Sequence, residues 1–401
     1  MTRQDPDPTR SLALPPQQTH ERCPVSIIIK ALNEEKGIAA TLESALRAVA
    51  AVGGEVVLAD ACSSDQTVEI ARRYPVRIVQ LAHPQERCCG AGPQLGFQHA
   101  HGEFLYLVDG DMLLGEDFLP RALSFMRGHP DVAGVGGRVS EKNLSSPEYQ
   151  MRHELWAEGQ CGQVSRLDGG GLYRRSAIEQ AGYFSDRNLH SYEEFELATR
   201  LRALGWMLWR MPIEAVSHYG HETPPYQLLR RRWRNGYLFG LGELLRASGD
   251  RQRLGLLLRE LHEVRLYAVV VLGWAALLAV LLLWPAALAW RLTLLATALA
   301  AAVGLMSWRK RSFKRGVYAI VSWNFNAAGM LFGLLRRRTD ASRTIESRLL
   351  QDTLGAPAPW VAPASLSPWL KPGPFARTVP QAVPAERYPQ PLDPLEIPHA
   401  N

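Results

Sequence analysis

The sequence predicts an α/β domain with a parallel, doubly wound sheet, followed by a helical hairpin that crosses a membrane. Between residues 24 and 111, short β-branched runs alternate with segments of helical spacing. Right-handed crossovers then give a parallel sheet. Residues 266–335 are far more apolar than the rest of the 401-residue chain, and clusters of arginine flank them, as is typical of membrane helices.

Four strands and three helices make up the first part of the predicted domain. The strands are expected at 24–32, 53–60, 76–81 and 103–111, and the helices at 33–49, 63–74 and 92–102. Asn33 is placed to cap the first helix. Asp60 and Asp109 stand at the carboxyl ends of two strands. Because ligands of such sheets bind beyond these ends, we expect the functional site there.

Two aspartates separated by one glycine end the fourth expected strand, in the stretch FLYLVDGDMLL. Charged side chains are rare in a buried strand unless something pairs with them. In a turn, Asp109 and Asp111 can converge on one Mg²⁺ or Mn²⁺, whose open positions accept diphosphate oxygens. Such a metal neutralises the charge that builds on a departing phosphate. Taken alone, the motif also fits an ordinary strand-end turn.

Two further groups of acids carry both a functional and a structural interpretation. Asp60 fits hydrogen bonding to a nucleotide's ribose or base, and equally a helix cap near Ser63. Glu193, Glu194 and Glu196 fall at a helix start, where carboxylates suit the helix dipole. Their mutual repulsion is also expected to raise carboxylate pKa values, which favours one of them as a general base.

Charge and cysteine content narrow the function classes. The net charge is +6 and the pI about 9.1. The arginines flank apolar segments, at 230–234, 309–315 and 336–338, which favours a membrane surface over a nucleic acid. Five cysteines suggest no disulfide framework. The polar N-terminus lacks a signal-peptide core, so we expect a reduced domain that stays in the cytoplasm.

The C-terminal half is expected to hold a hairpin of Leu266–Trp284 and Leu292–Trp308, turning near Pro285, with both ends cytoplasmic. Gly316–Leu335 is a third uncharged stretch; the arginines after it favour an interfacial or re-entrant helix over a true span. The expected parts are a disordered lead (1–23), the α/β domain (24–245), a basic connector (246–265), the hairpin (266–308), a basic loop with the third helix (309–338) and a largely disordered Pro-rich tail (339–401).

Four motifs occur in one order over residues 24–240 and together resemble the family 2 glycosyltransferases of the GT-A fold. They are SIIIKALNEEKGIAATLES, VVLADACSSDQTVEIA, HAHGEFLYLVDGDM and GGGLYRRSAIEQAGYFSDRNLHSYEEFELATRLRALGW. The resemblance implies a Rossmann-like, mostly parallel sheet with flanking helices. It also implies transfer of a sugar from a nucleotide-diphosphate sugar to an acceptor hydroxyl, with inversion at the anomeric carbon.

The resemblance also assigns roles to residues. Glu194 stands where the family usually has an aspartate base, and Glu193 and Glu196 would orient the site. Asp111 would hold the metal and the diphosphate, and Asp109 would lie near the ribose or the metal. Donor-binding residues are expected to be Asn33, Glu34, Asp60, Arg87, Asp109, Arg232 and Trp233.

Some of these positions depart from the family pattern. An Arg-Asn pair common before Gly96 is Pro93 and Gln94 here, and Arg87 is expected to replace the missing cation. Processive synthases carry Gln-x-x-Arg-Trp, but Leu229 takes the place of the glutamine, which disfavours a processive enzyme. Arg231, Arg232 and Trp233 fit either a cover for the diphosphate or a basic membrane-surface helix. His218 fits either a metal ligand or an ordinary loop histidine.

The resemblance and the apolar helices together predict a membrane-anchored inverting glycosyltransferase that uses Mg²⁺ or Mn²⁺. UDP-sugars are the default donor, and the acceptor is expected to be a lipid-linked or cell-surface polysaccharide precursor. The expected location is a bacterial inner membrane, with the catalytic domain facing the cytoplasm. A nucleotidyltransferase would normally show a glycine-rich phosphate loop near the first strand, where this chain has acids. A non-catalytic membrane scaffold that binds sugar nucleotides is the other alternative; no nucleic-acid partner is expected, and the oligomeric state is left open.

Overall fold

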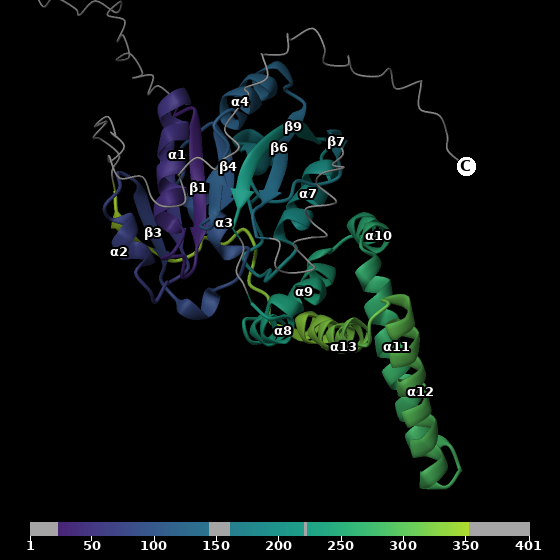
Figure 1. Cartoon of the computed structure of the whole chain (residues 1–401). Helices are drawn as coiled ribbons and strands as arrows, with labels where there is room; N and C mark the ends of the chain where they lie inside the picture. Colours follow the sequence, from purple (N-terminus) through teal and green to yellow (C-terminus); the bar gives the residue numbers. More distant parts are fainter. Residues whose placement is uncertain (1–22, 144–160, 220–222, 353–401) are drawn as a thin grey trace, which may run out of the picture. The chain divides into compact units, whose positions relative to one another are not determined.

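The computed structural model describes residues 23–143, 161–219 and 223–352 (Figure 1). The predicted N-terminal lead, apart from its last residue, and the tail beyond residue 352 lie outside these ranges.

The predicted parallel half of the sheet is present. It consists of β1 (Val25–Ala31), β2 (Glu55–Asp60), β3 (Arg77–Leu81) and β4 (Phe104–Asp109). Strand β1 pairs in parallel with β2 and β4, and β2 pairs in parallel with β3. The crossovers contain α1 (Ile38–Val52), α2 (Thr67–Ala71) and α3 (Ala91–His99).

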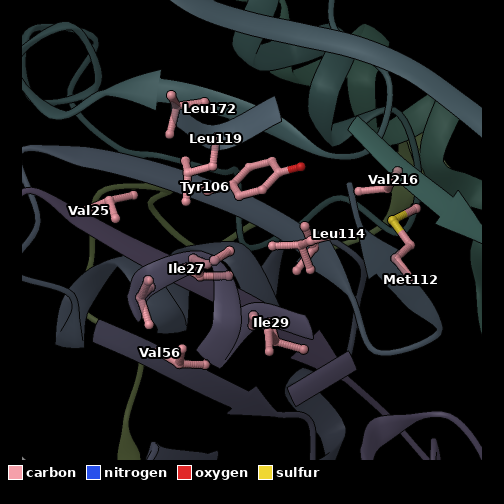
Figure 2. Packing of buried hydrophobic residues seen from close by; sticks show 14 of the residues in the cluster. Val25, Ile27, Ile29, Val56, Tyr106, Met112, Leu114, Leu119, Leu172 and Val216 are labelled. Carbon is pink, nitrogen blue, oxygen red and sulfur yellow. The ribbon is translucent and has the colours of Figure 1, made fainter. Parts of the chain in front are cut away.

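Two hydrophobic cores cover the two faces of this sheet. Successive side chains of a strand point to opposite faces, so Ile27 and Ile29 join one core and Ile28 joins the other. Figure 2 shows Ile27 and Ile29 packed in the same cluster as Tyr106 of β4. The second core receives Leu95 of α3. Burial on both faces explains why these strands are apolar at nearly every position.

The second half of the sheet is mixed, with both parallel and antiparallel pairs. Its strands are β5 (Met112–Leu114), β6 (Val132–Glu141), β7 (Gly162–Val164), β8 (Gly171–Arg174) and β9 (Met207–His218). Strand β8 is antiparallel to β4 and β6, β9 is parallel to β6, and β5 and β7 are antiparallel to β9. Helices α4 (Phe118–Gly128), α6 (Arg175–Gln180) and α7 (Glu193–Ala203) connect them. The connections between these later strands vary in length and do not continue the strand–helix alternation of the first four strands.

Asn33 does not cap the first helix, which corrects the prediction. Helix α1 begins at Ile38, and Gly37 stands at its N-cap without a side-chain hydrogen bond. Asn33 adopts a left-handed φ of 60°, and its side-chain oxygen accepts a hydrogen bond from the backbone N–H of Ser64 at 2.7 Å. Its side chain therefore joins the loop after β1 to the loop after β2.

A layer of helices follows the sheet. It comprises α8 (Pro225–Arg234), the 3-10 turn η2 (Tyr237–Phe239), α9 (Gly240–Ala247), α10 (Arg251–Glu260), α11 (His262–Leu283), α12 (Leu288–Arg309) and α13 (Phe313–Leu335). Within the described ranges, α11, α12 and α13 are long and apolar enough to cross a membrane, with mean hydropathies of 2.7, 1.7 and 1.3. Helices α11 and α12 lie side by side as the expected hairpin (Figure 1).

Helix α13 differs from the hairpin because it packs on the last elements of the α/β domain. It contacts α8, η2 and α9 as well as α12. The approach is backbone to backbone: a Cβ atom added at Gly333 would overlap the carbonyl oxygen of Phe239, and one at Gly242 would overlap that of Met330. Small residues at these positions let the helix lie directly on η2 and α9.

The chain then returns to the sheet, which the sequence did not predict. Strand β10 (Ser347–Gln351) pairs antiparallel with β3, although residues 339–352 were expected to belong to a disordered tail. Asp352 accepts hydrogen bonds from the Arg77 guanidinium, and the Gln98 side chain bonds both backbone groups of Ile345. The short sequence SRLLQ adds an edge strand because these distant partners hold it there.

Candidate active site

A cleft of about 690 Å³ opens at the carboxyl ends of the parallel strands, where the sheet predicts a ligand site. Residues from the ends of β1, β2 and β4 form one wall, and α8 and η2 form the other. Of the predicted site residues, the cleft is lined by Glu34, Arg87, Asp109 and Asp111.

A lysine at the end of β1 organises the acids of the first wall. Lys30 Nζ lies 3.1 Å from Asp109 Oδ1 and 3.2 Å from Glu193 Oε1. Burial lowers the pKa of Lys30, but the charges of these two acids outweigh it and hold the pKa well above its ordinary value. The sequence analysis missed Lys30, although a lysine inside the buried run IIIKA was a signal of the same kind as the aspartates.

Asp111 belongs to a second chain of charges. His218 lies at the end of β9 rather than in a loop, and its Nε2 is 3.3 Å from Asp111 Oδ2. Its Nδ1 is 2.7 Å from Glu141 Oε2, in a side chain that is almost fully buried. Burial lowers the pKa of His218, but its bonds to Asp111 and Glu141 prevail and raise the pKa to about 10. Glu141 was not predicted, because nothing near it in the sequence points to His218.

To hold a divalent cation, Asp111 and His218 would exchange the proton on His218 Nε2 for the metal, and a substrate would complete its ligands. Among the described residues, no group of three or more His, Cys, Asp or Glu side chains is arranged to hold a metal ion. Magnesium is commonly bound by one or two carboxylates together with substrate phosphates. A metal-binding histidine usually has a carboxylate on its other ring nitrogen, as Glu141 is here.

Glu194 is the acid of the α7 start that fits a general base. Its Oε1 accepts a hydrogen bond from the backbone N–H of Gly169 at 2.9 Å. Burial raises the pKa of Glu194 to about 8, Lys30 lowers it, and Glu193 raises it further. The sequence analysis correctly expected that repulsion between the acids raises the pKa of Glu194, but burial is the larger cause of this increase. A base with a pKa near the working pH is effective in proton transfer.

Glu196 lies apart from the other two acids, which corrects its predicted role in orienting the site. Its carboxylate is buried against Arg200, whose Nε lies 2.8 Å from Glu196 Oε1, and it accepts a hydrogen bond from the Tyr183 hydroxyl. Glu196 therefore stabilises the packing of α7 within the domain.

Asp60 holds the loop after β2 and does not cap a helix, because α2 begins at Thr67 with Gln66 at its N-cap. Its Oδ2 accepts hydrogen bonds from the Ser63 backbone and from the Gln80 amide, at 3.0 and 2.8 Å. Its Oδ1 is buried and has no hydrogen-bond partner among the described residues. An unpaired buried acceptor is costly, so Oδ1 fits a hydrogen-bond donor from a ligand. The neighbours Ala59 and Ala61 line the cleft.

The other predicted donor residues divide between the cleft and the helical layer. Glu34 faces the cleft, where burial and the nearby charge of Asp111 raise its pKa to about 8. Arg87 donates hydrogen bonds to the carbonyl oxygens of Ala61 and Cys62, so it holds the loop after β2. Asn33 holds the same loop, as described above, and is not among the residues that line the cleft.

Arg232 and Trp233 do not line the cleft, which corrects the prediction that they cover a diphosphate. The Trp233 ring packs edge-on against rings of η2 and α13, with centroids 5.3–5.6 Å apart. The Arg232 guanidinium lies 5.0 Å from the ring centroid of Tyr237. Arg231, the third residue of that prediction, does line the cleft, together with Arg234 three residues further along α8.

Comparison with known proteins identifies the domain. Residues 26–182 match the family model Glycosyl transferase family 2. This chain carries a family 2 glycosyltransferase domain. The match confirms the predicted family and the enzyme class, and the mixed sheet with flanking helices agrees with the GT-A fold.

Individual relatives are distant and match part of the chain. The glycosyltransferase domain is 27% identical over 156 residues to a probable glucomannan 4-beta-mannosyltransferase 15 of Arabidopsis thaliana, covering 35% of this chain and 29% of the relative. It is 32% identical over 139 residues to the poly(ribitol-phosphate) beta-N-acetylglucosaminyltransferase TarS of Staphylococcus aureus, covering 31% and 24%. The chain thus spans less than a third of either relative.

One solved structure shares the fold over a larger part of the chain. It is the mannosyltransferase PcManGT of Pyrobaculum calidifontis in complex with GDP-Man and Mn²⁺. The similarity covers 78% of this chain and 87% of that one, with a TM-score of 0.50 and 19% sequence identity.

Proposed function

We propose that this chain is a membrane-anchored, metal-dependent glycosyltransferase that moves a sugar from a nucleotide-diphosphate donor to an acceptor hydroxyl, with inversion. The observation that carries the proposal is the meeting of Asp111 and His218 with Glu194, Lys30 and Asp109 at one edge of the sheet. The Arabidopsis and staphylococcal relatives are named as sugar transferases, and PcManGT was solved with a nucleotide sugar and Mn²⁺. UDP-sugars are the first donors to test, and GDP-mannose the next.

Asp111 lines the cleft, and His218, Asp60 and Glu194 lie beside it; these residues would divide the chemistry among them. Asp111 and His218 would hold a divalent cation, which neutralises charge on the leaving diphosphate when bound. Asp60 Oδ1 would accept a hydrogen bond from the nucleoside. Glu194 would remove the proton from the acceptor hydroxyl as its oxygen attacks the anomeric carbon. The ion pairs of Lys30 with Asp109 and Glu193 keep these two acids in fixed positions.

We further propose that the acceptor reaches the cleft from a lipid surface. Helices α11 and α12 leave nearly all of their apolar stretches uncovered by protein. Helix α13 packs on α8 and η2, the elements that also line the cleft, which favours an interfacial helix. One wall of the cleft is thus continuous with the layer that would touch the membrane, as suits a lipid-linked acceptor. The arginines around the spans favour a domain on the cytoplasmic side of a bacterial inner membrane.

A transfer assay tests this function. Membranes that contain the full chain are incubated with Mn²⁺ and each of a set of labelled UDP-sugars and GDP-mannose, and label is followed into the lipid fraction. One donor is expected to label lipid, and the new linkage is expected to have the inverted anomeric configuration. Label that enters only soluble products would contradict the lipid-linked acceptor. Donor binding without transfer to any fraction would favour a sugar-nucleotide-binding scaffold.

A further inference from the structure

A second, smaller cavity lies where the end of α13 meets the glycosyltransferase domain. Its volume is about 140 Å³. Two carboxylates, Glu86 and Glu243, line it. It is also lined by six arginines: Arg87, Arg187, Arg246, Arg336, Arg337 and Arg338. Three of these arginines, at 336–338, directly follow α13. The sequence analysis used them only to judge the orientation of that helix, but in the structure they line this cavity of the domain.

Acidic partners compensate half of these arginines. Arg187 Nη2 lies 2.9 Å from Glu86 Oε1. Arg336 Nη1 lies 3.3 Å from Glu243 Oε1. Arg338 Nη2 lies 2.5 Å from a carboxylate oxygen of Asp186, which is fully buried. These ion pairs fix the walls of the cavity and neutralise its charge only in part.

The other three arginines leave positive charge at the cavity. Arg87 donates to the backbone carbonyls of the loop after β2, and Arg246 donates to those of Leu334 and Arg336. Arg337 is exposed to solvent, and no ion pair to it is found within the described ranges. Neutral carbonyls hold a guanidinium in place without cancelling its charge, so several like charges converge on a small volume.

We propose that this arginine cavity binds a phosphate group. Guanidinium groups present paired N–H donors that match phosphate oxygens, and a bound anion would relieve the repulsion between Arg87, Arg246 and Arg337. The phosphate belongs either to an anionic lipid headgroup or to a soluble phosphate compound. At the same end of α13, Phe332 and Leu335 are 56% and 82% exposed. Apolar side chains beside arginine are typical of a surface that meets anionic lipid.

The arginine cavity adjoins the donor cleft, because Arg87, Cys88, His190 and Arg336 line both. Arg246 and Arg337 line the arginine cavity and are absent from the lining of the cleft. The proposal does not depend on glycosyl transfer, and these two arginines allow it to be tested without altering the cleft.

The test uses the full chain in a neutral detergent and three probes: dihexanoyl-phosphatidylglycerol, dihexanoyl-phosphatidylcholine and inorganic phosphate. Binding is measured by calorimetry for the wild type, the double variant Arg246→Gln/Arg337→Gln and the single variant Arg337→Gln. The control is Arg348→Gln, an exposed arginine of β10 away from the cavity. Circular dichroism checks that each protein is folded.

We expect saturable binding of phosphatidylglycerol but not of phosphatidylcholine, weakened roughly tenfold or more in the double variant and unchanged by Arg348→Gln. The exposed Arg337 is not expected to be needed for folding, so Arg337→Gln alone should show part of the loss. If phosphatidylglycerol binds and inorganic phosphate does not, the ligand is a lipid headgroup. If both bind, a soluble phosphate ligand is sufficient. The proposal is overturned if neither phosphatidylglycerol nor inorganic phosphate binds the folded wild type, or if the double variant binds them as tightly as the control does.

Discussion

The two walls of the cleft are built differently. On the sheet side, Lys30, Asp109 and Asp111 are held by other charged side chains from neighbouring strands. On the helical side, Arg231 and Arg234 stand on α8, which is joined to α13 through aromatic rings. A charged group whose partners are already fixed needs little rearrangement when a reaction begins. The sheet side therefore suits chemistry, and the helical side suits ligand binding.

The largest expected effect is on the sheet side. Glu194→Gln keeps the shape of the side chain but removes its ability to accept a proton. We expect kcat to fall by about 10²–10⁴-fold while donor binding is retained. Steady-state transfer rates and donor titrations measure the two quantities. The control is Glu116→Gln, an exposed acid, and full activity of Glu194→Gln would remove this residue as the base.

The pH profile supplies a second readout for Glu194. Burial raises its pKa to about 8, and only the deprotonated form can accept a proton. The kcat of the wild type should therefore rise as the pH increases through about 8. The residual rate of Glu194→Gln should lack this rise. A wild-type rate that stays constant between pH 6 and 9 would show that the base is another group.

The next effect concerns Glu141, which supports the sheet wall from behind His218. Glu141→Gln removes the charge that orients the imidazole. Loss of such a partner typically weakens metal binding by about 10- to 100-fold. Titration of Mn²⁺ by electron paramagnetic resonance, with the nucleotide present, measures this directly. Unchanged Mn²⁺ affinity would mean that His218 is not a ligand and pairs with Asp111 for structural reasons.

The smallest expected effect is on the helical side. Arg231→Gln removes a charge that lines the cleft without touching the acids of the sheet wall. We expect the donor KM to rise by about tenfold, with kcat unchanged. The neighbour Arg232, which lies against Tyr237 instead, provides the matched control Arg232→Gln. A larger loss of kcat in Arg231→Gln than in Glu194→Gln would reverse the comparison between the two walls.

The sequence predicted those parts of the site that local patterns determine. The β-branched runs located β1 to β4, and the acids after β2 and β4 then had to meet at one edge. The sequence did not predict which side chains from distant parts of the chain pair with one another. Lys30 and Glu193 are 163 residues apart, and Glu141 and His218 are 77 apart. Strand β10 was missed for the same reason, because most of the chain, including the helical layer, separates it in the sequence from its partner β3.

Helix phase explains a different error. The basic helix that the sequence offered as one of two interpretations around Trp233 is present as α8, but which of its arginines face the cleft depends on how α8 packs. The Trp233 ring turns toward Phe325 and Phe332 of α13, so Arg231 and Arg234 turn toward the cleft. Those rings come from almost a hundred residues further along the chain, and no local pattern contains them.

The most direct test of the central claim is calorimetric titration of a nucleotide sugar into the full chain, with Mn²⁺ and then with EDTA. The wild type is compared with Asp111→Asn and with the exposed control Asp117→Asn. We predict that the wild type and Asp117→Asn bind one donor with Mn²⁺ and lose it with EDTA, and that Asp111→Asn binds poorly in both. Donor binding that is unaffected by EDTA and by Asp111→Asn, in folded protein, would contradict a metal-dependent site at the end of β4.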